Sequence, residues 1–208
     1  AGPANKQGRI AADNICGGNS RFHGSQGSSV LKLFGLTAAS TGINEKAAQA
    51  AGIAYDKVVL FPASHAAYYP GAQSMAMKVL YEKESLRLLG AQIVGGDGVD
   101  KRIDVLATAI RAKMTALELT ELDLSYAPPY SSAKDPVNMA GFMIEDLESG
   151  KVRQFHWNDV EDLPCDGSAT LLDVRTAWEY QRGHLDGFRN VPLDDLREHL
   201  DELDRGKP

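Results

Sequence analysis

The chain has 208 residues, which is long enough for one large domain or two small ones, each with its own core. Its composition, 43% hydrophobic and 24% charged with 20 glycines, is that of a soluble globular protein and not of a disordered or fibrous one. A net charge of -6 provides no basic field for nucleic acid or an anionic membrane surface, so neither is predicted as a partner.

The sequence shows no signals for targeting, disulfide bonds or metal binding. No apolar run approaches a membrane span, and the first residues carry no basic and apolar leader pattern, so we expect a cytoplasmic protein. Cys16 and Cys165 lie 149 positions apart without a CxxC motif, and the five histidines share no metal-ligand spacing. We therefore predict neither a disulfide framework nor a metal site.

The first predicted element is a helix with Pro3 at its first turn, stopped by Gly17 and Gly18. Residues 28–94 then read mostly as strands. In one of them Met75, Met77, Val79 and Tyr81 alternate with other residues, the period of a sheet with one covered face. The predicted strands are residues 30–34, 36–41, 58–61, 74–81 and 86–94.

Three helices are predicted among and after these strands. A short one spans 45–51, and a longer one spans 100–114, with an apolar stripe on one side and Lys101, Arg102 and Arg111 in solvent. Asp135 caps a third helix that runs through residue 147 and ends at Gly150. Together these patterns predict an antiparallel sheet covered by helices.

From about residue 152 the pattern changes. The apolar run 169–174 has no alternation and suits a central parallel strand, with Asp173 and Arg175 at its carboxyl end, where ligand sites collect in open α/β sheets. A helix over 176–183 and a charged amphipathic helix over 194–203 follow. This is about half of an α/β domain.

Two tyrosine-rich loops stiffened by proline stand out as parts of a binding site. One reads HAAYYPGA over residues 65–72, and the other reads SYAPPYSSAKDP over residues 125–136. Half-buried phenols need hydrogen-bond partners, so such loops are costly as mere connections.

Several spaced blocks resemble known families. The segments AGPANKQGRIAADNI, STGINEKAAQAAGI, HAAYYPGA, GGDGVDKRIDVLATAI and YAPPYSSAKDPVNMAGFMIEDL resemble the C-terminal part of FAD-dependent pyridine nucleotide-disulfide oxidoreductases, in the branch of coenzyme A disulfide reductase, NADH oxidase and persulfide reductase. TLLDVRTAWEYQRGHLDGFRNVPLDDL resembles the first half of a rhodanese domain. The resemblance implies an α+β dimerisation domain (antiparallel sheet covered by helices) followed by the first half of an α/β rhodanese domain. The implied divisions are 1–22, the C-terminal helix of an FAD domain; 23–150, the dimerisation domain; and 151–208, the partial rhodanese domain.

The same resemblance implies the cofactors and partners. These are FAD, NAD(P)H and coenzyme A, held mainly by parts outside this chain, a small thiol, disulfide or persulfide substrate, and a homodimer formed through residues 23–150. The glycine fingerprints and the redox cysteine of the family are not in this sequence, and neither is the rhodanese cysteine loop. We therefore expect the chain alone to be inactive.

Carried over by motif, Tyr68 and Tyr126 resemble the catalytic phenols that face the substrate sulfur and the flavin, with Tyr69 and Tyr130 as adjacent alternatives. Lys134 resembles a family residue that contacts coenzyme A. It lies at a predicted helix start, where a cation and free backbone amides jointly receive an anion.

The chain start resembles the helix whose first amides face the flavin, which assigns cofactor contacts to Ala1, Gly2 and Pro3 and a substrate contact to Lys6. The pair Asp173 and Arg175 resembles a scaffold that orients the rhodanese cysteine loop.

Other functions compete with a reductase of coenzyme A disulfide, coenzyme A persulfide or polysulfide. The main alternatives are a non-catalytic homodimerisation module and an NADH oxidase that reduces O2; a free-standing sulfur-binding regulator is disfavoured by the missing cysteine loop. Exposed apolar surface on the sheet and on helix 100–114 favours the dimerisation module, whereas tyrosines that project into a cleft favour the enzyme.

Overall fold

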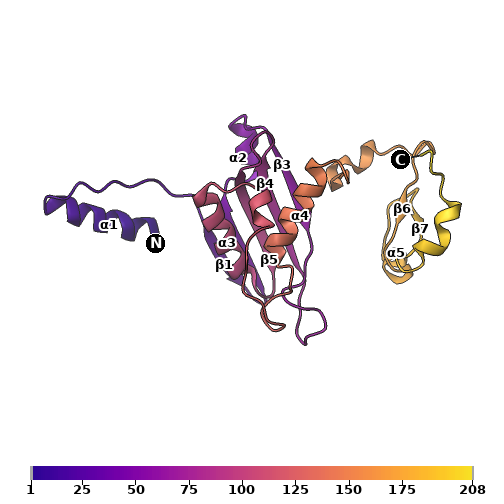
Figure 1. Cartoon of the computed structure of the whole chain (residues 1–208), viewed down its shortest axis with the longest axis horizontal. Helices are drawn as coiled ribbons and strands as arrows, with labels where there is room; N and C mark the ends of the chain where they lie inside the picture. The colour runs from indigo at the N-terminus through magenta and orange to yellow at the C-terminus, as the bar shows by residue number, and fades with distance from the viewer. Residues whose placement is uncertain (1, 208) are drawn as a thin grey trace. The chain divides into compact units, whose positions relative to one another are not determined.

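The computed structural model describes residues 2–207, and the chain divides into two compact units, Ala1–Arg153 and Gln154–Pro208 (Figure 1). Each unit has its own sheet. No helix within residues 2–207 is long and apolar enough to cross a membrane.

The first unit is built on a five-stranded antiparallel sheet. Its strand order is β1-β2-β5-β4-β3, and every neighbouring pair is antiparallel. The β4 and β5 hairpin lies in the centre, as the alternation of methionine, valine and tyrosine in β4 predicts. The strands are β1 (Ser29–Leu33), β2 (Leu36–Gly42), β3 (Tyr55–Leu60), β4 (Met75–Glu82) and β5 (Leu88–Gly95).

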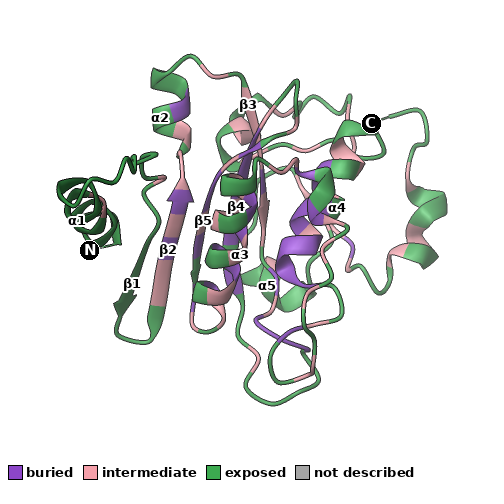
Figure 2. Cartoon of the chain, turned by 60° about the vertical axis from the view of Figure 1, so that its left-hand side comes forward, coloured by how far each residue is buried: buried purple, intermediate pink, exposed green. Residues whose placement is uncertain are grey.

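Helices α3 (Val99–Ala112) and α4 (Pro136–Glu148) cover one face of this sheet (Figure 1). Helix α3 packs on β2 and β5, and α4 packs near β3. The strand register aligns Ala39 and Met77 on either side of Ile93, and all three are buried beneath the helices. Burial of each large aliphatic side chain contributes about 1.5–3 kcal/mol, so this layer is the main source of stability. Figure 2 shows the buried residues concentrated between the sheet and the two helices.

Helix α4 begins as predicted, because the Asp135 side chain accepts hydrogen bonds from the first turn and the Asn138 side chain accepts one from the backbone of Asp135. The prediction that Arg102 stays in solvent is wrong. Arg102 is only 1% exposed and belongs to the buried side of α3.

The opposite face of the sheet is covered at one end and open at the other. Helix α2 (Glu45–Ala50) covers one end, where the Glu45 carboxylate bonds the Nζ atoms of Lys57 at 2.5 Å and Lys78 at 2.7 Å. At the other end apolar side chains stay exposed, because no helix of the described residues lies over them. They are Leu31, Leu33, Leu36 and Val94.

Helix α1 (Gly2–Ile15) buries none of its residues. Gln26, in the segment between α1 and β1, attaches that segment to β2 and α3 of the first unit. The side-chain amide of Gln26 donates to the Thr41 hydroxyl at 3.1 Å and to the Ala107 carbonyl at 2.8 Å, and the backbone carbonyl of Gln26 accepts from the Gly42 amide.

The second unit holds a two-stranded parallel sheet of β6 (Leu172–Asp173) and β7 (Arg189–Asn190), with helix α5 (Ala177–Arg182) between them. The parallel pairing agrees with the prediction, but the prediction of a central strand over 169–174 is wrong: β6 has only two residues and one neighbouring strand among the described residues. The predicted helix 194–203 is a 3₁₀ helix, η3 (Leu196–Glu202). It buries no residue fully, and a short segment without tertiary packing gains little from α-helical geometry. The remaining elements are the 3₁₀ helices η1 (Leu117–Leu119) and η2 (Trp157–Asp162).

Candidate functional site

The structure brings Tyr68 and Tyr126 into direct contact. Their hydroxyl oxygens lie 3.1 Å apart, although the two residues are 58 positions apart in the chain. Tyr68 is 76% exposed and Tyr126 is 48% exposed. The hydrogen bond with Tyr68 raises the pKa of Tyr126 above its usual value.

The two loops that carry these phenols are joined through their backbones. The Ala66 amide donates to the Ser131 carbonyl at 3.0 Å, and within the second loop the amides of Tyr130 and Ser131 both donate to the Ala127 carbonyl. The contact between the phenols is therefore part of a larger loop-to-loop connection.

The adjacent tyrosines have different environments. Tyr69 packs its ring edge-on against the buried His65 ring, with ring centroids 5.8 Å apart. Tyr130 is exposed. Tyr69 therefore helps to fix its own loop. That Tyr69 or Tyr130 acts in place of Tyr68 or Tyr126 stays a prediction.

Beneath the second loop lies a buried ion pair that the sequence reasoning missed. The Arg102 guanidinium donates to the Asp135 carboxylate at 3.0 Å, to the Ser131 hydroxyl at 3.2 Å and to the Tyr130 carbonyl at 3.3 Å. Burial raises the pKa of Asp135, but hydrogen bonds from the Val137 amide, Ser131 and Arg102 outweigh it and hold the pKa below its usual value. A usable signal was present in the sequence, because Arg102 lies three positions after Val99 and four before Leu106, on the apolar stripe.

Lys134 is exposed beside the start of α4, but the amides there are not free. Pro136 has no N–H, and the Asp135 side chain accepts from the Val137 amide at 3.0 Å and from the amide of Asn138. The prediction that free amides join Lys134 in receiving an anion is wrong, because the cap carboxylate already fills that position. A contact from the Lys134 ammonium alone stays a prediction.

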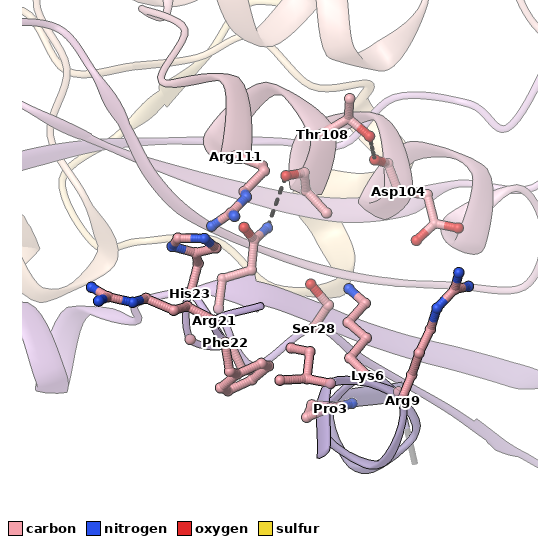
Figure 3. Close-up of a pocket in the computed structure, with 16 residues that line it drawn as sticks. Pro3, Lys6, Arg9, Arg21, Phe22, His23, Ser28, Asp104, Thr108 and Arg111 are labelled. Carbon is pink, nitrogen blue, oxygen red and sulfur yellow. Dashed lines mark hydrogen bonds between the residues drawn. The ribbon is translucent and has the colours of Figure 1, made fainter. Parts of the chain in front are cut away.

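The other predicted contacts meet in a cavity of about 870 Å³ between α1, the segment after it and α3 (Figure 3). Gly2, Pro3 and Lys6 all line it, as does the anchoring residue Gln26. Ala1 lies outside the described residues.

The cavity is basic. Figure 3 shows Lys6 and Arg9 rising from α1 towards the residues of α3, with Arg21 and His23 on the connecting segment. Lys6, Arg9, Arg21 and Arg111 oppose the single carboxylate of Asp104. Such a wall attracts phosphates and other anions. The sequence reasoning found Lys6 but not the three arginines that complete the wall, Arg9, Arg21 and Arg111.

In the second unit Arg175 and Asp173 form a bidentate ion pair, with Arg175 Nε 3.0 Å from one carboxylate oxygen and Nη2 2.6 Å from the other. The hydrogen bonds from Arg175 hold the pKa of Asp173 below its usual value. The Asn190 side chain donates to the backbone carbonyls of both residues and so fixes the turn between β6 and α5.

Cys16 and Cys165 are both free and exposed. Within residues 2–207 no group of three or more histidine, cysteine, aspartate or glutamate side chains is arranged to hold a metal ion.

Comparison with known proteins identifies the family. Residues 29–136 match the model of the pyridine nucleotide-disulphide oxidoreductase dimerisation domain, and residues 156–208 match that of the rhodanese-like domain. The chain belongs to the pyridine nucleotide-disulphide oxidoreductase family, and the predicted fold, an α+β dimerisation domain followed by a rhodanese-like segment, is confirmed.

Individual relatives support this assignment. The chain is 41% identical over 145 residues to a coenzyme A disulfide reductase of Staphylococcus haemolyticus, covering 69% of this chain and 32% of the relative. Its structure is similar to that of reduced Bacillus anthracis CoADR-RHD, with 47% identity, a TM-score of 0.89, and coverage of 99% of this chain and 37% of the other. An NAD-dependent persulfide reductase from A. fulgidus gives 41% identity and a TM-score of 0.87, covering 97% of this chain and 36% of the other. The chain thus spans about a third of the length of the curated relatives it matches.

Proposed function

We propose that the chain is the C-terminal dimerisation and rhodanese portion of a flavin-dependent, NAD(P)H-driven reductase of coenzyme A disulfide, coenzyme A persulfide or polysulfide. The observation that carries this proposal is the exposed pair of hydroxyl groups of Tyr68 and Tyr126. The names of the relatives, coenzyme A disulfide reductase and persulfide reductase, support the substrate class.

The phenol pair suits a sulfur substrate. Each hydroxyl has one proton, so the phenol that accepts the hydrogen bond at 3.1 Å keeps its own O–H free to donate outward. A thiolate that develops during disulfide or persulfide reduction is stabilised by such a donor.

The basic cavity suits the anionic parts of the ligands. Lys6 and the arginines that line it fit the phosphates of coenzyme A, and the first turn of α1, with Gly2 and Pro3, has no acidic residue and fits an electron-rich ring. When bound, FAD supplies the hydride-transfer chemistry that connects NAD(P)H with the sulfur substrate.

We also propose that the first unit forms a homodimer, in which the phenol pair of one subunit completes the flavin site of the other. The match to a dimerisation domain and the exposed leucines on the open half of the sheet support this proposal. Helix α3 does not add to the dimer surface with its apolar stripe, because Val99, Ile103 and Leu106 are buried within the unit. A cytoplasmic location, the division at residues 22 and 150, and Ala1 as a flavin contact are retained as proposals from the sequence.

The test uses the complete reductase of which we propose this chain to be a part. Tyr68→Phe and Tyr126→Phe should each lower kcat for coenzyme A disulfide and coenzyme A persulfide, by about 10²-fold if the donor acts in the transition state. Tyr55→Phe is the control, because the Tyr55 hydroxyl bonds Gln49 and Glu45, on α2.

Unchanged turnover in both variants and in the double variant would contradict the role of the phenols and favour a non-catalytic dimerisation module. Loss of turnover in Tyr69→Phe or Tyr130→Phe, with Tyr68→Phe and Tyr126→Phe active, would move the site to the adjacent tyrosines.

A further inference from the structure

We propose that Arg102 is a positioning residue that holds the loops of Tyr68 and Tyr126 together and so sets the contact between the two phenols. The catalytic consequence of this inference rests on the proposed function, but the structural consequence does not.

The Arg102 side chain is tightly packed inside the first unit. It is buried, and Nη1 donates to the Gly98 carbonyl at 3.1 Å. Gly98 has a φ of +69°, and a Cβ atom at this position would lie 2.1 Å from Arg102 Nη1. A side chain one turn before Arg102 would therefore displace the guanidinium from this position.

From this position the α3 helix holds both ends of the Tyr126 loop. Arg102 Nη2 donates to the Tyr130 carbonyl and to the Ser131 hydroxyl. The neighbouring Lys101 donates to the Ser125 carbonyl at 3.5 Å, directly before Tyr126. The loop is thus fixed on either side of its phenol by two adjacent cations of one helix.

The connection continues to the Tyr68 loop through Ser131. Its hydroxyl is bound to Arg102 and to Asp135, and its carbonyl accepts from the Ala66 amide, two residues before Tyr68. A displacement of Ser131 therefore moves the anchor of one loop relative to the other, and the hydroxyl contact at 3.1 Å depends on both.

The shape of the guanidinium matters as well as its charge. Arg102 contacts Asp135, Ser131, Tyr130 and Gly98 with three nitrogens that point in different directions. A lysine ammonium keeps the positive charge next to the buried carboxylate but cannot reach all of these acceptors at once. Arg102→Lys is therefore a variant that retains the charge and loses the positioning.

The first experiment observes the phenols directly in the full 208-residue chain. Tyrosine ring carbons are labelled with ¹³C, and their titration is followed by NMR in the wild type, Arg102→Lys, Gly98→Ala and the control Lys151→Met, which removes an exposed ion pair with Asp146. We expect the titration midpoint of Tyr126 to fall towards that of a free tyrosine in the first two variants, and to stay unchanged in the control.

Circular dichroism and thermal unfolding confirm that each variant is folded, and Ser131→Ala provides a milder perturbation of the same connection if Arg102→Lys unfolds. An unchanged Tyr126 titration in every folded variant of this set would overturn the proposal.

The second experiment is a double-mutant cycle in the complete reductase. We expect Arg102→Lys to lower kcat by about 10- to 100-fold, the effect of misplacing a catalytic group by about 1 Å, with a smaller change in KM. In the Tyr68→Phe, Tyr126→Phe background Arg102→Lys should cause no further loss, because the groups that it positions are absent.

Equal losses in both backgrounds would show that Arg102 acts on stability alone and would overturn the proposal. If the double tyrosine variant is itself fully active, the proposed function fails, while the NMR titration still decides whether Arg102 sets the phenol contact.

Discussion

Truncation of Leu31 should weaken the proposed homodimer strongly. Leu31 pairs with Ala38, which in turn pairs with Val94, so these side chains lie on the open half of the sheet. Leu31 is 61% exposed in the isolated chain. Full burial of a leucine contributes about 1.5–3 kcal/mol, so about 1–2 kcal/mol per subunit remains to be gained at an interface. A two-fold dimer contains the residue twice, and Leu31→Ala should raise the dimer Kd by about 30- to 700-fold.

Sedimentation velocity over a dilution series measures this constant. Leu200→Ala, which truncates an exposed leucine of the second unit, is the matched control and should leave the Kd unchanged. A Leu31→Ala protein that dimerises as tightly as the wild type would refute the assignment of the interface to the open half of the sheet.

Two further predictions concern the sheet domain. Burial raises the pKa of Glu45, but the hydrogen bonds from Lys57 and Lys78 lower it from 4.5 to about 2, so the stability from this carboxylate is present above pH 4.5 and is lost as the pH falls towards 2. Glu45 and its two lysine partners are partly exposed, so Glu45→Gln should lower the free energy of unfolding by about 1 kcal/mol at pH 7 and by progressively less below pH 4.5. Urea unfolding measures this loss, and an equal loss at pH 7 and pH 3 would contradict the prediction. Gly42→Ala should cost more than Gly52→Ala in the same assay, because both glycines have a positive φ but only at Gly42 does a Cβ meet backbone, 2.2 Å from the Leu89 carbonyl oxygen. Equal costs would show that the backbone shifts without penalty.

The strands and helices of the first unit were predictable because burial follows the local periods of the sequence. The alternation in β4 and the cap at Asp135 both correspond to observed contacts. Arg102 was misplaced because residue type was weighed above position: its spacing from Val99 and Leu106 put it on the buried stripe, but its charge suggested solvent. A buried arginine requires a carboxylate partner, and Asp135 lies 33 positions away, beyond any local pattern.

The candidate site was predictable one loop at a time. Each tyrosine loop is visible in the sequence, but the hydroxyl contact depends on the bond between the Ala66 amide and the Ser131 carbonyl, which no spacing encodes. The basic cavity shows the same limit. Arg21 and Arg111 lie on different elements, and the anchoring of Gln26 to the Ala107 carbonyl and to β2 brings the connecting segment beside α3.

The narrow space between Gly98 and Arg102 links two positions of the sequence in evolution and in protein engineering. A Cβ atom at position 98 would lie 2.1 Å from Arg102 Nη1, so a side chain there displaces the guanidinium from its acceptors. Relatives that carry a larger residue at the first position are therefore expected to have lost arginine at the second, together with the acid at position 135. The presence or absence of this glycine gives a simple criterion for sorting members of the family by how their tyrosine loop is supported.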